Sequence, residues 1–563
     1  MTAVRRDPAP VPERVGRRDL TAVAALGALA AGVPLWLAAA SGAIGIPGGD
    51  EWVYVRGAAS LHATGVIDMP GHTAASVGQL LLVQPLLWLS GGMPWAFTAF
   101  GLVMGLLGVA SAYLLARRFV GVGSAVLVGL LVFAVPGFAR QTASFTTDVP
   151  ASALTILCLL LGVAWARGGR RAQLVASLGI GLVAVSVREF ALAAPVAVLV
   201  AAWARSRAGE RRPIAWASVA FAAGLAAVFL VAYSIPNRGM ATDGSPGLPL
   251  YVAPAFTTLA AGVLPAAILG VDRRLADLRP AHVIFGAALV GGAMVLSPFG
   301  PFVGYIWEPN GIASDAYLSG ARSAVIPARA WVMSEQLAVL AGTLVAALLL
   351  RWALRRGAGA RSRSAALAVL GRIGRSPEAP LLLFLGLSAA GFAVYNTLYP
   401  LFDRYLYPLV PVAAILLLRG ATRVWAPGRA QIFAHAGLVW LAASALVIAA
   451  SSFAYDAARW RAGEAAVALG YAPQTVDAGY EWVGAHAFGQ GAAGAHDYGL
   501  TWYDDLWLSF RPCAVVSNSP LDRAGLVLIR EDPSAYRLYL LAGPGQPLYL
   551  YGSTAAGCPA PPA

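Results

Sequence analysis

Residues 20–40 read LTAVAALGALAAGVPLWLAAA, and the chain continues through SGAIGIPGGDEWVY at residues 41–54. The first stretch is uncharged and has the length of about 20 residues that a helix needs to cross the hydrocarbon core of a bilayer. The second stretch places two adjacent acids, Asp50 and Glu51, just beyond that span. Carboxylates are costly to keep at a membrane boundary, so the pair indicates a functional site.

The composition of the whole chain indicates a polytopic α-helical membrane protein. Of its 563 residues 58% are hydrophobic and 12% are charged, and the mean hydropathy is +0.68. The net charge of +13 comes from arginine alone, because the sequence contains no lysine. These arginines cluster in short segments between apolar runs, where they mark the cytoplasmic side of the membrane. We therefore expect no nucleic-acid partner.

The positions of the arginine clusters predict a topology with about thirteen transmembrane helices. A basic tail at 1–19 is expected in the cytoplasm, and an outer loop at 41–76 carries the acidic pair. The densest basic segment, 351–378, is expected to be a cytoplasmic loop. The predicted crossings are 20–40, 94–117, 120–138, 149–166, two within 172–204, 214–235, 251–271, 281–299, 331–350, 379–398, 405–419 and 432–453.

The composition changes after the last predicted crossing. We expect a transmembrane domain over 20–453 and a small extracytoplasmic domain of mixed α/β structure over 454–563. Its short β-like runs include 526–529 and 538–541. Cys513 and Cys558 would then lie in an oxidising compartment, and the sequence leaves open whether they pair.

The predicted topology brings several charged residues to the outer face. Sugar transfer at that face cannot draw on cytosolic nucleotide sugars, so its donor would be a sugar carried on a lipid phosphate. Such a reaction needs a carboxylate to accept the proton of an acceptor hydroxyl and cations to hold the departing phosphate. Asp50, Arg188 and Arg404 are the candidates for these two roles.

Several motifs resemble those of the C-type (GT-C) glycosyltransferases that use polyprenyl-phosphate sugars, especially the protein O-mannosyltransferase and aminoarabinose-transferase relatives. They cover most of the chain in the expected order. The resembling stretches are Asp50-Glu51 with Gly65-Val66-Ile67-Asp68, Phe145-Thr146-Thr147-Asp148-Val149-Pro150, Val187-Arg188-Glu189-Phe190, Phe402-Asp403-Arg404-Tyr405-Leu406-Tyr407-Pro408, and Asp477-Ala478-Gly479-Tyr480-Glu481-Trp482. The last of these has no role assigned from sequence.

The resemblance implies an inverting displacement at the anomeric carbon of the sugar, with Asp50 as the catalytic base. The implied catalytic carboxylates are Asp50, Glu51 and Asp148; the implied donor-phosphate ligands are Arg188 and Arg404; the implied substrate contacts are Tyr54, Glu189 and Tyr405. Asp148 would orient the acceptor or share a divalent metal cation with Asp50, and metal use is left open. For His62 and His72 in the first outer loop, surface or packing roles are expected because their spacing fits no metal motif.

The expected protein is a multi-pass enzyme of the plasma (inner) membrane whose partners are a polyprenyl-phosphate sugar donor and the lipid bilayer. The acceptor could be a glycan, a lipid or a protein, and the sugar is not specified. A transporter or flippase of lipid-linked sugars is the alternative, although no internal repeat is evident and the acids cluster at one membrane boundary. A polysaccharide polymerase fits the short Thr-Asp-Val-Pro loop less well.

Overall fold

The computed structural model of the chain is mainly helical. It describes residues 16–69, 76–235, 249–274, 278–295, 297, 300–311, 320, 323–357, 374–396, 401–419, 424–425, 427–486, 512–539 and 543–561. The His72 position and most of the basic segment 351–378 lie outside the described residues.

The helices and strands follow one another in an order that places all strands in the C-terminal part. They are α1 (Arg17–Ser41), α2 (Glu51–Thr64), α3 (Val77–Ser90), α4 (Trp95–Arg117), α5 (Val122–Ala134), α6 (Phe138–Thr142), α7 (Asp148–Ala166), α8 (Arg171–Val187), η1 (Glu189–Leu192), α9 (Ala193–Arg205), η2 (Ala208–Glu210), α10 (Arg211–Ser234), α11 (Pro249–Gly262), α12 (Leu264–Arg274), α13 (Pro280–Val295), α14 (Ala328–Gly357), α16 (Ala379–Tyr395), η5 (Asp403–Leu406), α17 (Leu409–Leu418), α18 (Arg429–Ala468), η6 (Pro473–Thr475), β1 (Val476–Asp477), α19 (Tyr480–His486), β2 (Ala514–Ser517), β3 (Leu526–Arg537) and β4 (Gly545–Ser553).

The number of helices able to cross a membrane is smaller than the sequence predicts. Among the described residues, α1, α4, α7, α10, α14 and α18 are long and apolar enough, and α11 with α12 forms a further candidate bent by 75°. Several other expected crossings fall on apolar helices of 10–17 residues, which are shorter than the hydrocarbon core requires. The chain is thus a multi-pass membrane protein, and the count of thirteen is not confirmed.

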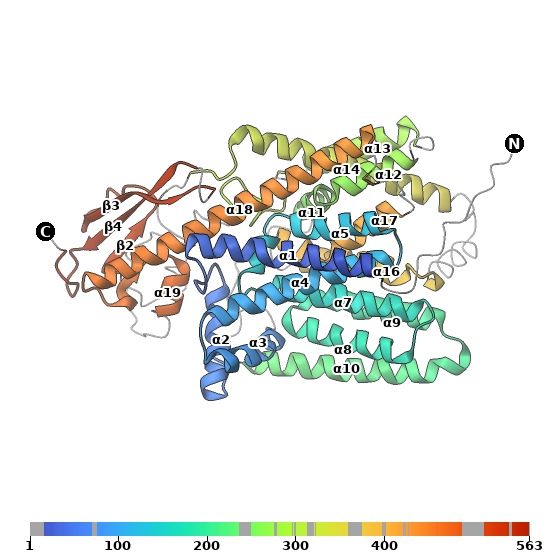
Figure 1. Cartoon of the computed structure of the whole chain (residues 1–563), viewed down its shortest axis with the longest axis horizontal. Helices are drawn as coiled ribbons and strands as arrows, with labels where there is room; N and C mark the ends of the chain where they lie inside the picture. The colour runs from blue at the N-terminus through green and yellow to red at the C-terminus, as the bar shows by residue number, and fades with distance from the viewer. Residues whose placement is uncertain are drawn as a thin grey trace.

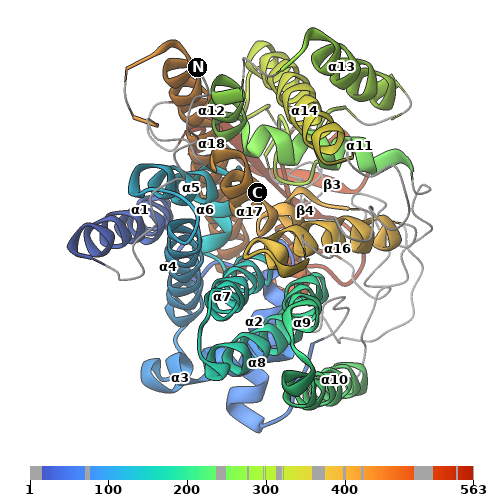
Figure 2. The ribbon, with the colours of Figure 1, turned by 90° about the vertical axis from the view of Figure 1, so that its right-hand side faces the viewer.

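The helices run roughly along the longest axis of the molecule, with the β-strands and α19 gathered at one end (Figure 1). We refer to this end as the sheet end. The N-terminus of α1 points toward the opposite end, and α2 lies at the sheet end beside α19. Viewed along the axis, α8, α9 and α10 gather on one side and α12, α13 and α14 on the other, with α17 between them (Figure 2).

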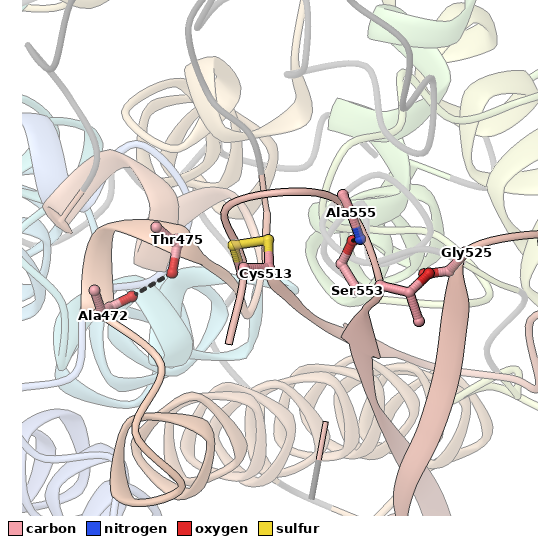
Figure 3. The surroundings of a disulfide bond; sticks show 8 residues. Ala472, Thr475, Cys513, Gly525, Ser553 and Ala555 are labelled. Atoms are coloured by element: carbon pink, nitrogen blue, oxygen red, sulfur yellow. Dashed lines mark hydrogen bonds between the residues drawn. A yellow bond between two sulfur atoms is a disulfide. The ribbon is translucent and has the colours of Figure 1, made fainter. Parts of the chain in front are cut away.

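A four-stranded sheet in the order β1-β2-β4-β3 forms the C-terminal domain. β1 pairs with β2 in parallel, whereas β4 is antiparallel to both β2 and β3. The run predicted at 526–529 lies in β3, but Leu538 and Tyr539 form the turn after it, because the chain must reverse there to enter β4. Cys513, next to β2, forms a disulfide with Cys558 (Figure 3).

The last membrane-spanning helix belongs to both parts of the molecule. α18 continues without a break to Ala468, so the boundary expected at 453/454 falls inside it. Beyond that point Tyr455 and Ala458 pack in one buried cluster with Trp482 and Leu550 of the C-terminal domain. A continuous helix with one end in the bundle and the other in the domain core fixes the sheet against the bundle.

Candidate functional site

Asp50 immediately precedes α2 at the sheet end. It occupies the N-cap position, yet its side chain makes no capping hydrogen bond. The carboxylate instead faces Arg404, with 3.7 Å between Asp50 Oδ2 and Arg404 Nη2, and Tyr480 donates a hydrogen bond to Oδ1 at 3.4 Å. Its side chain is 39% exposed. Asp50 is therefore a partly solvated carboxylate, free of a capping role, that faces a cation.

Arg404 bridges two carboxylates. Its Nε lies 3.4 Å from Asp148 Oδ2, while its Nη2 faces Asp50. The guanidinium also lies over the ring of Tyr305, with 4.2 Å between the guanidinium carbon and the ring centroid. The neighbouring acids raise the pKa of Arg404 well above its ordinary value, against the opposing effect of burial. Arg404 is thus a permanent cation held between Asp50 and Asp148.

A second arginine contacts the same buried aspartate. Arg188 Nε lies 3.6 Å from Asp148 Oδ1, and Asp148 is only 1% exposed. Arg188 also donates hydrogen bonds to Thr147 Oγ1 at 2.8 Å and to the Tyr405 hydroxyl at 2.7 Å. Two guanidiniums sharing one carboxylate leave a net charge of about +1 on these three side chains.

Asp403, next to Arg404 in the chain, is occupied elsewhere. Its Oδ2 accepts hydrogen bonds from the backbone N–H groups of Ile306 at 3.0 Å and Trp307 at 2.6 Å. Burial raises the pKa of Asp403 to about 7, although these hydrogen bonds lower it. These bonds fix the loop that carries Tyr305. The φ angle of Tyr305 is 101°, a strained backbone conformation for a residue other than glycine.

Glu51 has a different environment from Asp50. Its carboxylate accepts backbone hydrogen bonds from Phe145 N at 2.6 Å and Gly48 N at 2.9 Å, and the residue is 4% exposed. Burial raises the pKa of Glu51 to about 7, with Arg140 as the main opposing influence. Through these hydrogen bonds Glu51 joins the acidic loop to the segment before α7.

A pocket at the sheet end lies between these groups. Asp50, Arg404 and Tyr305 line it together with Arg140 and Asp456. Arg140 Nη2 and Asp456 Oδ2 are 2.6 Å apart. A side chain at Gly48 would displace the end of the Arg140 guanidinium from this pair.

Among the uncharged side chains of the pocket lining, two buried polar atoms lack hydrogen-bond partners within the described residues. They are Gln141 Oε1 and Thr146 Oγ1, and the two residues are 3% and 9% exposed. Buried polar groups without partners are uncommon in folded proteins and favour binding of a polar ligand. The pocket thus offers uncharged polar contacts beside the charged ones.

Two of the three expected substrate contacts, Tyr54 and Tyr405, lie close to Arg188, whereas the third, Glu189, is outside the pocket lining. Tyr54 is buried, and burial raises its pKa to about 12 while Arg188 opposes this. Tyr405 carries the hydroxyl that Arg188 contacts. Glu189 is half-buried at the start of η1, and it is not among the residues that line the pocket.

The sequence leaves open whether Asp50 and Asp148 share a divalent cation. Among the described residues, no group of three or more His, Cys, Asp or Glu side chains is arranged to hold a metal ion. The guanidinium of Arg404 already contacts both Asp50 and Asp148. With Arg404 between them, Asp50 and Asp148 do not fit a shared cation.

Sequence reasoning missed part of the site. It assigned no role to Tyr305, Arg140 or Asp456, and it left the 477–482 motif without one. Tyr305 and Asp456 lie in segments without a recognisable motif, so only folding brings them to Asp50. Arg140 carries a usable signal, because it is an arginine on the predicted outer side, where few arginines are expected.

Comparisons with known proteins return similar solved structures only. No protein-family model matches the chain, and no curated protein matches it. ArnT from Cupriavidus metallidurans bound to undecaprenyl phosphate is 14% identical, with a TM-score of 0.41 over 96% of this chain and 98% of that one. The archaeal oligosaccharyltransferase AglB from Archaeoglobus fulgidus, in complex with an inhibitory peptide and a dolichol-phosphate, is 15% identical, with a TM-score of 0.39 over 88% of this chain and 64% of that one.

At these TM-scores the two matches carry no argument about this chain.

Proposed function

We propose that this chain is an integral membrane glycosyltransferase that moves a sugar from a polyprenyl-phosphate donor to an acceptor hydroxyl on the extracytoplasmic face. The observation that carries the proposal is the contact of Arg404 with the partly exposed Asp50 and the buried Asp148, at the end of a bundle of apolar helices. A base and a phosphate-binding cation are the two parts that this reaction requires.

The combined charge of Arg188, Arg404 and Asp148 is opposite in sign to that of the donor phosphate. A sugar joined to a lipid through one phosphate is a phosphodiester and carries one negative charge. Arg188, Arg404 and Asp148 together carry about one positive charge. Guanidiniums bind phosphate oxygens through paired N–H groups, so the two arginines are suited to hold this group.

The proposed reaction is a single displacement with inversion. The acceptor oxygen forms a bond to the anomeric carbon while the bond from that carbon to the phosphate oxygen breaks, and both electrons of the broken bond stay with the lipid phosphate. Asp50 accepts the proton of the acceptor hydroxyl. Arg404 and Arg188 stabilise the added negative charge on the departing phosphate.

Other side chains of the site position Asp50 and the two arginines. Asp148 is too buried to reach an acceptor, and it orients both arginines. Tyr405 fixes the plane of Arg188 through its hydroxyl. Glu51 fixes the loop that carries Asp50 through its bond from Gly48 N.

Sidedness is supported by the C-terminal domain. Cys513, which is paired with Cys558, directly precedes β2, and β2 lies at the same end of the molecule as α2, which begins directly after Asp50. Disulfides form and persist mainly in oxidising compartments, whereas cytosolic thiols stay reduced. The site would then face the extracytoplasmic side of the plasma membrane.

The experiment that tests this function offers polyprenyl-phosphate sugars, including mannosyl and arabinosyl donors, to membranes that contain the protein. Transfer of labelled sugar to an acceptor with release of polyprenyl phosphate is the expected result. Movement of the intact labelled lipid across the bilayer, without any cleavage of the sugar-phosphate bond, would instead establish a flippase and contradict the proposal.

A further inference from the structure

The 477–482 motif, which has no role from sequence, lies directly beside the acidic loop. Its first residue, Asp477, ends β1 and accepts a hydrogen bond from Gly479 N at 3.0 Å. This turn starts α19 at Tyr480, so that the helix runs against α2. The motif thereby brings two C-terminal residues, Tyr480 and Glu481, to a loop more than 400 positions earlier in the chain.

Tyr480 contacts the proposed base itself. Its hydroxyl donates a hydrogen bond to Asp50 Oδ1 at 3.4 Å, and Tyr480 is only 2% exposed. Its ring meets the ring of Trp52 edge to face, with centroids 5.9 Å apart. Burial raises the pKa of Tyr480 well above its ordinary value, so the hydroxyl keeps its proton and remains a donor. Among the described residues, Tyr480 and Arg404 contact the Asp50 carboxylate, and Tyr54 also interacts with it electrostatically.

Glu481 holds the backbone next to the base. Its Oε1 accepts a hydrogen bond from Gly49 N at 2.5 Å, and its Oε2 lies 2.5 Å from Arg459 Nη1. Arg459 also pairs with Asp456 at 2.7 Å. Glu481 is 1% exposed, so this series of contacts ties the acidic loop to α18 through a buried carboxylate.

The packing around α19 leaves little freedom to shift. A side chain at Gly484 would clash with the Trp52 ring, so α19 and α2 approach as closely as glycine allows. On the other side, the Trp482 ring meets the Trp460 ring of α18 with centroids 5.0 Å apart. α19 is therefore held between α2 and α18 in one register, which fixes where Tyr480 and Glu481 point.

We propose that Tyr480 and Glu481 are positioning residues for Asp50, so that the C-terminal domain completes the catalytic site rather than only covering it. The inference rests on the proposed function, in which Asp50 is the base. Tyr480 orients the carboxylate and stabilises its ionised form, and Glu481 fixes the adjacent peptide group. Loss of either contact leaves the arginines that bind the donor phosphate unchanged.

The kinetic test compares Tyr480→Phe with Tyr471→Phe in the full-length protein. Tyr471 is an equally buried tyrosine of the C-terminal domain whose hydroxyl has no hydrogen-bond partner among the described residues. Tyr480→Phe is expected to lower kcat/KM about tenfold and to move the acidic limb of its pH profile up by about 0.5 to 1 unit, with little change in donor KM. Equal kcat/KM and an equal pH profile in the two variants would overturn the proposal.

A structural test does not depend on activity. Hydrogen exchange in residues 48–56 is expected to become at least about tenfold faster in Glu481→Ala, because the Gly49 amide loses its acceptor, while β2 and β4 keep their protection. Unchanged exchange in 48–56 would overturn the role of Glu481. If β2 and β4 lose protection as well, the Glu481→Ala variant is misfolded. The kinetic comparison of Tyr480→Phe with Tyr471→Phe then decides whether α19 positions Asp50.

The failure of this inference differs from that of the proposed function. If the wild type transfers no sugar from any donor, the proposed function fails, and the exchange data still report whether α19 holds the acidic loop. If the wild type is active and Tyr480→Phe matches Tyr471→Phe, only the inference fails.

Discussion

Arg404 Nη2 lies 3.7 Å from Oδ2 of Asp50, so the proposed base and the proposed phosphate ligand contact each other before any substrate binds. In an inverting displacement the base approaches the anomeric carbon from the side opposite the leaving phosphate. The sugar must therefore enter between the two groups. A donor phosphate that takes over the N–H groups of Arg404 would at the same time free Asp50 to accept a proton.

The geometry of Arg404 predicts the effect of a change that keeps its charge. Arg404→Lys retains the cation but loses the planar fork that reaches both carboxylates and the donor phosphate. We expect donor KM to rise about tenfold or more and kcat to fall, as measured by initial rates over a series of donor concentrations. Arg419→Lys is the matched control, because Arg419 is half-exposed and pairs with Glu378 away from the pocket. Equal donor KM in both variants would argue against phosphate binding by Arg404.

The buried carboxyl of Glu51 predicts a dependence of stability on pH. Burial raises its pKa from 4.5 to about 7, so between these values the folded protein binds a proton that the unfolded protein has released. The stabilising contribution is therefore complete below about pH 4.5 and is lost as the pH rises to about 7. Glu51→Gln should lack this component.

The measurement for Glu51 is the apparent Tm of the wild type and of Glu51→Gln at several values between pH 4.5 and 8. The wild type should lose a few degrees relative to the variant over this range. Asp68→Asn serves as the control, because the Asp68 side chain is 45% exposed and pairs with Arg56. Parallel Tm curves for the wild type and Glu51→Gln would show that Glu51 does not titrate in this way.

The unpartnered hydroxyl of Thr146 predicts a contact with the acceptor. Thr146→Val keeps the shape of the side chain and removes its hydrogen-bonding atom, so acceptor KM should rise about threefold to tenfold while donor KM stays the same. Thr155→Val is the control, since Thr155 Oγ1 is equally buried and unpartnered but does not line the pocket. The same acceptor KM in both variants would place the acceptor elsewhere.

The disulfide predicts both the stability and the location of the C-terminal domain. A bond between residues 45 positions apart stabilises a fold by about 4 kcal/mol in the chain-entropy account. Cys513→Ser should therefore make the domain more sensitive to protease. In intact cells, an impermeant maleimide should label the protein only after reduction, and labelling without reduction would contradict the paired state.

The sequence predicted the membrane class and the outlying β-rich domain because both depend on composition and hydrophobic runs. It also predicted that α8 and α9 are separated at Arg188-Glu189, where two charges interrupt an apolar stretch. It did not predict the number of spans, because an apolar run does not by itself determine the length of its helix. α17, for example, has only 10 residues.

The candidate site could be predicted only where its residues lie in motifs. Asp50, Asp148, Arg188 and Arg404 all lie in resembling stretches. In the structure Arg404 lies within 4 Å of both Asp50 and Asp148, and Arg188 lies within 4 Å of Asp148. The different environments of Asp50 and Glu51 could not be predicted, because adjacent residues at a helix start point in different directions. Tyr305 reaches Arg404 through a strained backbone that no sequence pattern indicates.

The most direct test of the central claim measures sugar transfer from a polyprenyl-phosphate donor by the wild type, Asp50→Asn and Asp68→Asn, with equal amounts of folded protein. The account predicts that Asp50→Asn lowers kcat by at least about a hundredfold with donor binding retained, because only the proton acceptor is lost, whereas Asp68→Asn remains close to the wild type. Transfer by Asp50→Asn at the wild-type rate would contradict the account and show that another group accepts the proton.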